Sequence, residues 1–142
     1  MATFAKLVSL SALLMLLPLS AMACGNKAAD PVKVVQEQVD AYNAHDIDAF
    51  AACYADNATI RDLSGKRPVI TGIAALKTTF AFLAKVPKDY HVDIVQRTVT
   101  GPTVVDHERV MGLPAGKGQP EAIAVYEVRD GKIQNVWFPP RS

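Results

Sequence analysis

The sequence predicts an α+β domain in which three helices precede a mainly antiparallel sheet. Up to Pro87, apolar residues recur at spacings of three and four, which is typical of helices that bury one face. After Pro87, apolar and polar residues alternate, and short turn segments separate the alternating runs, which is typical of strands joined by hairpins. Helices followed by a meander of strands favour a helical layer packed on one face of a sheet.

Three helices are expected between residues 31 and 85. Pro31 suits the first position of a helix whose cap is Asp30, and Asp46 can cap the second helix. The third helix is expected from Ile73 to about Lys85, just before the proline that stops it. The predicted apolar faces consist of Val32, Val35, Val39 and Tyr42 in the first helix, Ile47, Phe50, Ala51 and Tyr54 in the second, and Leu76, Phe80 and Leu83 in the third.

The strands are expected in five segments, separated by residues that favour turns. Gly101 and Pro102 turn the chain within the second half, and Asp130 with Gly131 is typical of a tight hairpin. A first short strand is expected directly after the second helix. The predicted strands cover residues 58–62, 91–100, 103–113, 121–128 and 133–138.

Residues 1–23 have the features of a signal peptide. Lys6 precedes an apolar run over residues 7–17, and Ala21-Met22-Ala23 matches an A-x-A cleavage site. The run is too short to span a bilayer as a mature helix. We therefore expect an exported protein in which residues 24–30 form a polar leader and residues 31–140 a single domain, which the length of 142 residues allows.

Two fates are open for Cys24, which directly follows the expected cleavage site. As a bacterial lipoprotein cysteine it would hold the domain on a membrane surface of the envelope, although Ala21 stands where that motif usually has leucine. Cleavage without lipidation would leave the domain free in the periplasm. A disulfide to Cys53 is allowed in an oxidising compartment, but a polar leader is a poor partner, so Cys53 is interpreted as a small core residue.

Charge and motif content exclude several classes of function. The chain has 15 Lys and Arg and 14 Asp and Glu, and removal of Lys6 with the signal peptide leaves 14 of each sign. No basic stripe is present, so no nucleic-acid partner is expected. Neither CxxC nor HExxH spacing occurs, so we expect neither a metal nor another cofactor.

Five segments carry a resemblance to a known superfamily: YNAHDIDAF at 42–50, YADNATI at 54–60, Gly72, ERV at 108–110 and VYEVRDGKI at 125–133. With them the chain resembles the nuclear transport factor 2-like superfamily, in its SnoaL-like and steroid Δ-isomerase-like branch. The resemblance implies a cone-shaped, cystatin-like fold, with three N-terminal helices on a strongly curved, mainly antiparallel sheet and a pocket at the wide end. Because activities on this fold are diverse, the resemblance says little about function.

The ketosteroid isomerases of this superfamily provide one comparison at the level of single residues. They carry a general-base aspartate at the end of the first strand, and Asp62 falls at that position. Their oxyanion is stabilised by a tyrosine and a protonated aspartate, for which Gln38 and Ala124 stand here. Gln38 donates only weakly and Ala124 does not donate, so steroid isomerisation by that mechanism is not expected.

Limonene-epoxide-hydrolase-like enzymes provide a second comparison. Arg109 matches their arginine, but Met111 and Phe138 replace its two aspartates, so the resemblance does not imply epoxide hydrolysis.

Alternation along residues 105–111 places His107, Arg109 and Met111 on one face, which the resemblance makes the pocket face. We therefore predict Asp62 as general base, supported by His107 and Arg109. The predicted pocket walls are Tyr54, Phe80, Met111, Ala122, Ala124, Tyr126, Val136 and Phe138.

Two functional hypotheses remain open from the sequence. In the first, the domain is an isomerase, cyclase or hydrolase acting on a small hydrophobic molecule. In the second, Asp62 and Arg109 form a structural ion pair, since buried charges are normally paired, and the domain is a non-catalytic binding or interaction module of the cell envelope. Trp137 is predicted to face away from the pocket, where it favours a homodimer through the sheet face.

Overall fold

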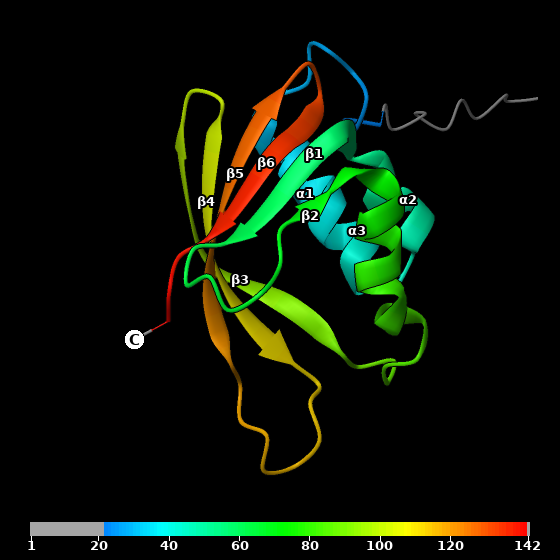
Figure 1. Ribbon diagram of the computed structural model, residues 1–142, viewed down its shortest axis with the longest axis vertical. Helices are drawn as coiled ribbons and strands as arrows, with labels where there is room; N and C mark the ends of the chain where they lie inside the picture. The colour runs from blue at the N-terminus through cyan, green and yellow to red at the C-terminus, as the bar shows by residue number, and fades with distance from the viewer. Residues whose placement is uncertain (1–21, 142) are drawn as a thin grey trace, which may run out of the picture.

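Three helices cover one face of a six-stranded sheet, which confirms the predicted fold class (Figure 1). The computed structural model describes residues 22–141. The helices are α1 (Pro31–Asn43), α2 (Ile47–Ala52) and α3 (Gly72–Phe80), which continues as the 3-10 helix η1 (Ala81–Ala84). The strands are β1 (Tyr54–Asp62), β2 (Ile70–Thr71), β3 (His91–Thr100), β4 (Thr103–Met111), β5 (Glu121–Arg129) and β6 (Lys132–Phe138).

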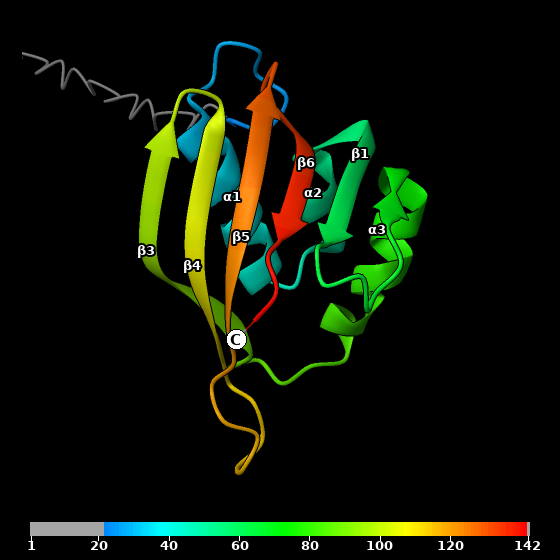
Figure 2. The ribbon, with the colours of Figure 1, turned by 60° about the vertical axis from the view of Figure 1, so that its left-hand side comes forward.

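The order of strands in the sheet brings the end of the chain back beside the first strand. The order is β2-β1-β6-β5-β4-β3, and only the pair of β1 and β6 is parallel (Figure 2). Within that pair Ile60 lies opposite Val136, and Asp62 lies opposite Phe138. The last residues of both strands therefore reach the same end of the sheet, where residues distant in sequence can share a site.

Side-chain caps begin the first two helices as the sequence predicts. The carboxylate of Asp30 accepts a 2.8 Å hydrogen bond from the amide of Val32, and Asp46 accepts one of 2.9 Å from Ala49. Both bonds satisfy amides that have no partner within the helix. Helix α3 ends at Phe80, earlier than expected, because the chain tightens into the 3-10 turn η1 before Pro87.

The first strand begins earlier than the sequence predicts, and the second helix ends earlier. Tyr54 is the first residue of β1 and not part of α2. It lies opposite Ile133 of β6, whose amide donates a 2.8 Å hydrogen bond to the carbonyl of Cys53. Pairing with a distant strand thus ends the helix, an effect that local periodicity does not contain. The two-residue strand β2 was also not predicted.

A disulfide joins Cys24 to Cys53, so the prediction of Cys53 as a free core cysteine is wrong. The bond ties residues 23–26, the N-terminal strap, to the end of α2. Glu37 accepts hydrogen bonds from the amides of Ala23 at 2.6 Å and Cys24 at 3.3 Å. The strap is therefore docked on the domain, and these additional contacts explain why it is a suitable disulfide partner.

The disulfide also bears on the two fates of Cys24. Its sulfur cannot carry a thioether-linked lipid while it is bonded to Cys53, so the disulfide and the lipid anchor are mutually exclusive. The predicted signal sequence comprises residues 1–23. Its residues 1–21 lie outside the described part of the chain. No helix within residues 22–141 is long and apolar enough to cross a membrane.

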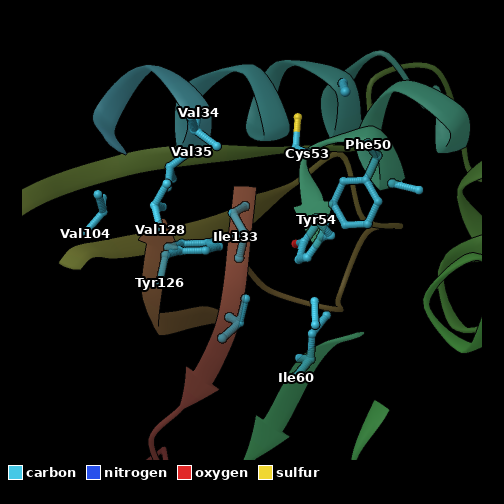
Figure 3. Close-up of a cluster of buried hydrophobic side chains, with 14 of the residues drawn as sticks. Val34, Val35, Phe50, Cys53, Tyr54, Ile60, Val104, Tyr126, Val128 and Ile133 are labelled. Carbon is cyan, nitrogen blue, oxygen red and sulfur yellow. The ribbon is translucent and has the colours of Figure 1, made fainter. Parts of the chain in front are cut away.

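The core lies between the helices and the inner face of the sheet (Figure 3). Phe50 of α2 stacks beside Tyr54, with ring centroids 5.1 Å apart. Val104 and Asp106 of β4 are completely buried on this inner face, and Arg97 satisfies the Asp106 carboxylate with two hydrogen bonds of 2.7 Å. Because side chains alternate along a strand, this burial fixes which residues of β4 point inward.

Candidate functional site

A cavity of about 400 Å³ opens between the helices and the inner face of the sheet. Its volume suits a small ligand, and most of its walls are apolar or aromatic, including all four tyrosines of the chain. Its deep walls are the buried residues Gln38, Val39, Phe50, Tyr54, Ile60, Tyr90, Tyr126 and Val136. Its rim is formed by the exposed residues Arg67, Pro68, Thr79, Phe82 and Arg141.

Glu108 of β4 is a carboxyl group that the sheet directs into this cavity. It follows Asp106 at the next inward position of β4, and its Oε1 accepts a 2.7 Å hydrogen bond from the hydroxyl of Tyr126. Burial raises the pKa of Glu108 to about 7, although the hydrogen bond from Tyr126 acts in the opposite direction. At neutral pH the carboxyl group is therefore divided between its protonated and ionised forms.

Neutral polar groups surround this carboxyl group. Burial raises the pKa of Tyr42, Tyr54 and Tyr126, so these phenols keep their protons. The hydroxyls of Tyr42 and Tyr90 lie 3.0 Å apart and share a hydrogen bond. Oε1 of Gln38 is the one buried side-chain oxygen or nitrogen within residues 22–141 that has no hydrogen-bond partner. An amide left unsatisfied in a largely apolar cavity is a candidate group for contact with a ligand.

Asp62 lies at the cavity, next to the rim, as the sequence predicts, but its carboxylate is already occupied. It accepts hydrogen bonds from the hydroxyl of Ser64 at 2.7 Å, the amide of Ser64 at 3.0 Å and Nε of Arg67 at 3.0 Å. The bonds from Ser64 and then from Arg67 lower the pKa of Asp62 to about 2. A carboxylate with so low a pKa is a weak base, and Asp62 serves here to fix the loop that follows β1.

A family model described as a SnoaL-like domain matches residues 35–136. The chain belongs to the SnoaL-like domain family. The solved structures similar to this SnoaL-like domain include an uncharacterised cystatin-fold protein from Novosphingobium aromaticivorans. The two proteins share 25% identity over 77% of this chain and 97% of the other, with a TM-score of 0.66.

Two further solved structures carry names that refer to an activity. A protein from Sinorhizobium meliloti named as a candidate polyketide cyclase is 21% identical over 74% of this chain and 92% of the other, with a TM-score of 0.62. A candidate ketosteroid isomerase from Kribbella flavida is 20% identical over 79% of this chain and 78% of the other, with a TM-score of 0.63. At this identity the two likenesses show the fold of the SnoaL-like domain and not its activity.

His107 and Arg109 of this SnoaL-like domain lie on the outer face of the sheet, so their predicted place in the pocket is wrong. Both bind the exposed Glu121: Nε2 of His107 lies 2.6 Å from its Oε2, and Arg109 lies 2.7 Å from its Oε1. The predicted pair of Asp62 with Arg109 is also absent, since Asp62 binds Arg67. The resemblance predicted that the face of β4 with His107 and Arg109 points into the cavity. The buried face is the other one, with Val104 and Asp106.

Six of the eight predicted wall residues line the cavity: Tyr54, Phe80, Ala122, Tyr126, Val136 and Phe138. Met111 shares the outward parity of Arg109, and Ala124 is completely buried in the core beside the cavity. Trp137 does not line the cavity, in agreement with its predicted outward direction. The missed residue is Glu108, and the alternation of β4 could not have identified it. Val104 and Val110 share its parity, but Val105 and Met111 give the opposite face the same number of apolar residues.

One group of three metal-ligand side chains lies together within residues 22–141. It comprises Cys24, Glu37 and Cys53. The two sulfur atoms are bonded to each other, so neither is available as a thiolate. This group therefore acts as the anchor of the N-terminal strap, not as a metal centre.

Proposed function

We propose that this SnoaL-like domain binds a small, largely apolar molecule with an oxygen function and transfers a proton on it, with Glu108 as acid and base. One observation carries the proposal: a carboxyl group with a pKa of about 7 faces an apolar cavity of ligand size and is held by the hydroxyl of Tyr126. A general acid-base group works best when its pKa lies near the working pH.

The proposed chemistry is proton transfer beside a carbonyl group. Ionised Glu108 takes a proton from the carbon next to the carbonyl, and the electron pair of that C–H bond moves into an enolate. If a C=C bond lies beside that carbon, the enolate is extended, and protonated Glu108 returns the proton to the γ carbon while the double bond moves into conjugation, which gives an isomer. If the enolate instead attacks a second carbonyl, Glu108 gives the proton to the resulting alkoxide, which gives a ring. Neither course needs an oxidant or a reductant. Isomerisation and cyclisation are also the activities named for the two relatives.

Gln38 and Tyr126 have supporting roles in this proposal. The hydrogen bond from Tyr126 favours the ionised form of Glu108, and thus its action as a base. Oε1 of Gln38 lacks a donor and lines the cavity, so a hydroxyl group of the ligand would satisfy it by donating a hydrogen bond. The aromatic walls exclude water, which strengthens both interactions.

We also propose that the domain acts after export, in an oxidising compartment. The disulfide between Cys24 and Cys53 supports this location, because such bonds persist in oxidising compartments and are rare in the cytosol. The signal features of residues 1–23 support it independently. The intact mass of protein purified from its own envelope tests the proposal. A mass without acyl chains, and two mass units below that of the reduced chain, is expected for a mature protein with this disulfide.

Exchange of carbon-bound hydrogen provides the test of catalysis. The bicyclic ketones tetralone and decalone are incubated with the protein in heavy water, and loss of the signal of the proton beside the carbonyl is followed by NMR. The substitution Glu108→Gln keeps the size and hydrogen-bonding capacity of the side chain, so we expect catalysed exchange to fall at least about 100-fold. Glu121→Gln on the outer face is the matched control and should leave the rate unchanged. Binding of both ketones without catalysed exchange would support the binding module instead.

A further inference from the structure

We infer that the molecule taken by this cavity is an organic acid whose apolar body enters the cavity and whose carboxylate stays at the rim on Arg141. The inference rests on the proposed function and adds the chemical class of the ligand. It follows from how charge is distributed between the deep walls and the rim.

The two guanidinium groups of the rim differ in what they bind. Nε of Arg67 donates to the carboxylate of Asp62 at 3.0 Å, and its guanidinium lies 5.8 Å from the centre of the Phe138 ring. Arg141 forms no salt bridge with a carboxylate of residues 22–141. Its charge does reach Glu108, where it lowers the pKa of the carboxyl group against the larger effect of burial. Arg67, Arg141 and Asp62 together give this end of the cavity one net positive charge, and Arg141 carries it.

The backbone holds Arg141 at this position. It follows Phe138, the last residue of β6, after two prolines, and proline fixes its own φ near −65°. The two prolines restrict the backbone that carries Arg141, and its side chain contributes to the cavity lining. A guanidinium presents paired donors that match the two oxygens of a carboxylate.

The deep end of the cavity is unsuitable for an anion. Glu108 lines the cavity among the buried tyrosines and is partly ionised at neutral pH, so it would repel a second carboxylate beside it. The remaining deep walls are apolar side chains, neutral phenols and the amide of Gln38, which do not compensate a buried charge. An acid can therefore satisfy both ends only with its apolar part inside and its charged group at Arg141.

The test compares two fluorescent probes that share one apolar body, naphthylbutanoate and naphthylbutanamide. Binding is measured by fluorescence titration of the full chain at about pH 8, where the acid is ionised. We expect the acid to bind about threefold to fivefold more tightly than the amide, the size typical of an exposed ion pair, and the preference to shrink at high salt.

Arg141→Gln should reduce the preference to about onefold while leaving the affinity for the amide unchanged. Arg61→Gln is the matched control, because Arg61 is exposed, adjoins Asp62 in sequence and does not line the cavity. It should keep the preference. Equal binding of the two probes to the parent protein, or a preference that survives Arg141→Gln, would overturn this inference and leave the apolar pocket intact. Failure of both probes to bind would remove the proposed function and this inference together.

Discussion

The hydroxyl of Tyr126 on β5 donates a 2.7 Å hydrogen bond to Oε1 of Glu108 on the neighbouring strand β4. Two opposing effects meet in this contact. Burial favours the neutral carboxyl group, whereas the phenol favours the carboxylate, and the resulting pKa of about 7 is well above the ordinary value of 4.5. The pair therefore provides a carboxyl group that can both accept and release a proton near neutral pH.

Removing the Tyr126 hydroxyl should raise the pKa of Glu108 further. Tyr126→Phe keeps the ring and deletes the donor that stabilises the carboxylate, so the midpoint should move above that of the parent. The measurement is an NMR titration of the glutamate side-chain carboxyl carbons. Tyr90→Phe removes a hydroxyl that contacts Tyr42 and not Glu108, and should leave the midpoint in place. A midpoint that falls in Tyr126→Phe would contradict the assigned role of this hydrogen bond.

The raised pKa of Glu108 should make the protein less stable as pH rises from about 4.5 to about 7. In that window the folded chain keeps a proton on Glu108 that the unfolded chain has lost, so the free energy of unfolding falls with increasing pH. The total loss is on the order of 3 kcal/mol. Urea unfolding of the parent and of Glu108→Gln at several pH values measures it, because the variant lacks this contribution.

Glu121→Gln provides a control for these urea experiments, because the contribution of Glu121 to stability depends on pH in the opposite direction to that of Glu108. The hydrogen bonds from Arg109 and His107 lower the pKa of Glu121, so its contribution to stability is present above the unfolded pKa and is lost as pH falls. If the parent and Glu108→Gln differed by a constant amount from acid to neutral pH, Glu108 would not titrate differently in the folded chain.

The disulfide should stabilise the domain chiefly by restricting the unfolded chain. Cys24 and Cys53 are separated by 29 residues, for which loop closure predicts a loss of about 3.6 kcal/mol when the bond is removed. The double variant Cys24→Ala/Cys53→Ala leaves no reactive thiol among residues 22–141, and urea unfolding measures the loss. A dithiol reductant should weaken the parent by a similar amount and have no effect on the variant. Equal stability of parent and variant would show that the strap contributes nothing.

Alanine substitutions at two glycines allow the stability cost of backbone strain to be distinguished from the cost of disturbing the strap. Gly131 (φ +70°) and Gly101 (φ +54°) both turn hairpins at positive φ, where alanine costs about 1–2 kcal/mol. A Cβ on Gly131 would also overlap the carbonyl of Asn26 in the strap, whereas one on Gly101 meets no atom within 4 Å.

Gly131→Ala should therefore lose more stability than Gly101→Ala. The added Cβ must displace the strap and so break the 2.8 Å hydrogen bond from the amide of Gly25 to the carbonyl of Gly131. The difference should therefore be about 1 kcal/mol, the typical value of such a bond. Thermal unfolding of both variants provides the comparison. The difference should shrink when the disulfide is reduced, since the strap is then held only by its hydrogen bonds.

The order of helices and strands could be predicted from the sequence because periodicity and capping residues are local signals. Asp30 and Asp46 cap the helices as expected, and the last four strands lie close to their predicted bounds. The ends of α2 and β1 could not be predicted in this way, because the pairing of Tyr54 with Ile133 joins segments distant in the chain.

The candidate site was predicted less well than the fold, because the two faces of a strand cannot be told apart from alternation alone. Alternation divides β4 into two faces but does not say which face is inside, so His107 and Arg109 were predicted in place of Glu108. The partner of Asp62 was missed for a similar reason, since the loop that brings Arg67 to it has no periodicity. The resemblance located the cavity through Asp62, yet the group best suited to proton transfer lies on a different strand.

The course of β6 determines where a handle can be attached to this protein. The strand begins at Lys132, next to the strap contact of Gly131, and ends at Phe138, which lines the cavity; at the usual rise per residue these ends lie about 20 Å apart. An affinity tag placed close to Arg141 would crowd the cavity entrance. Immobilisation through the N-terminal strap leaves the entrance facing solution, which makes it the better format for ligand screening.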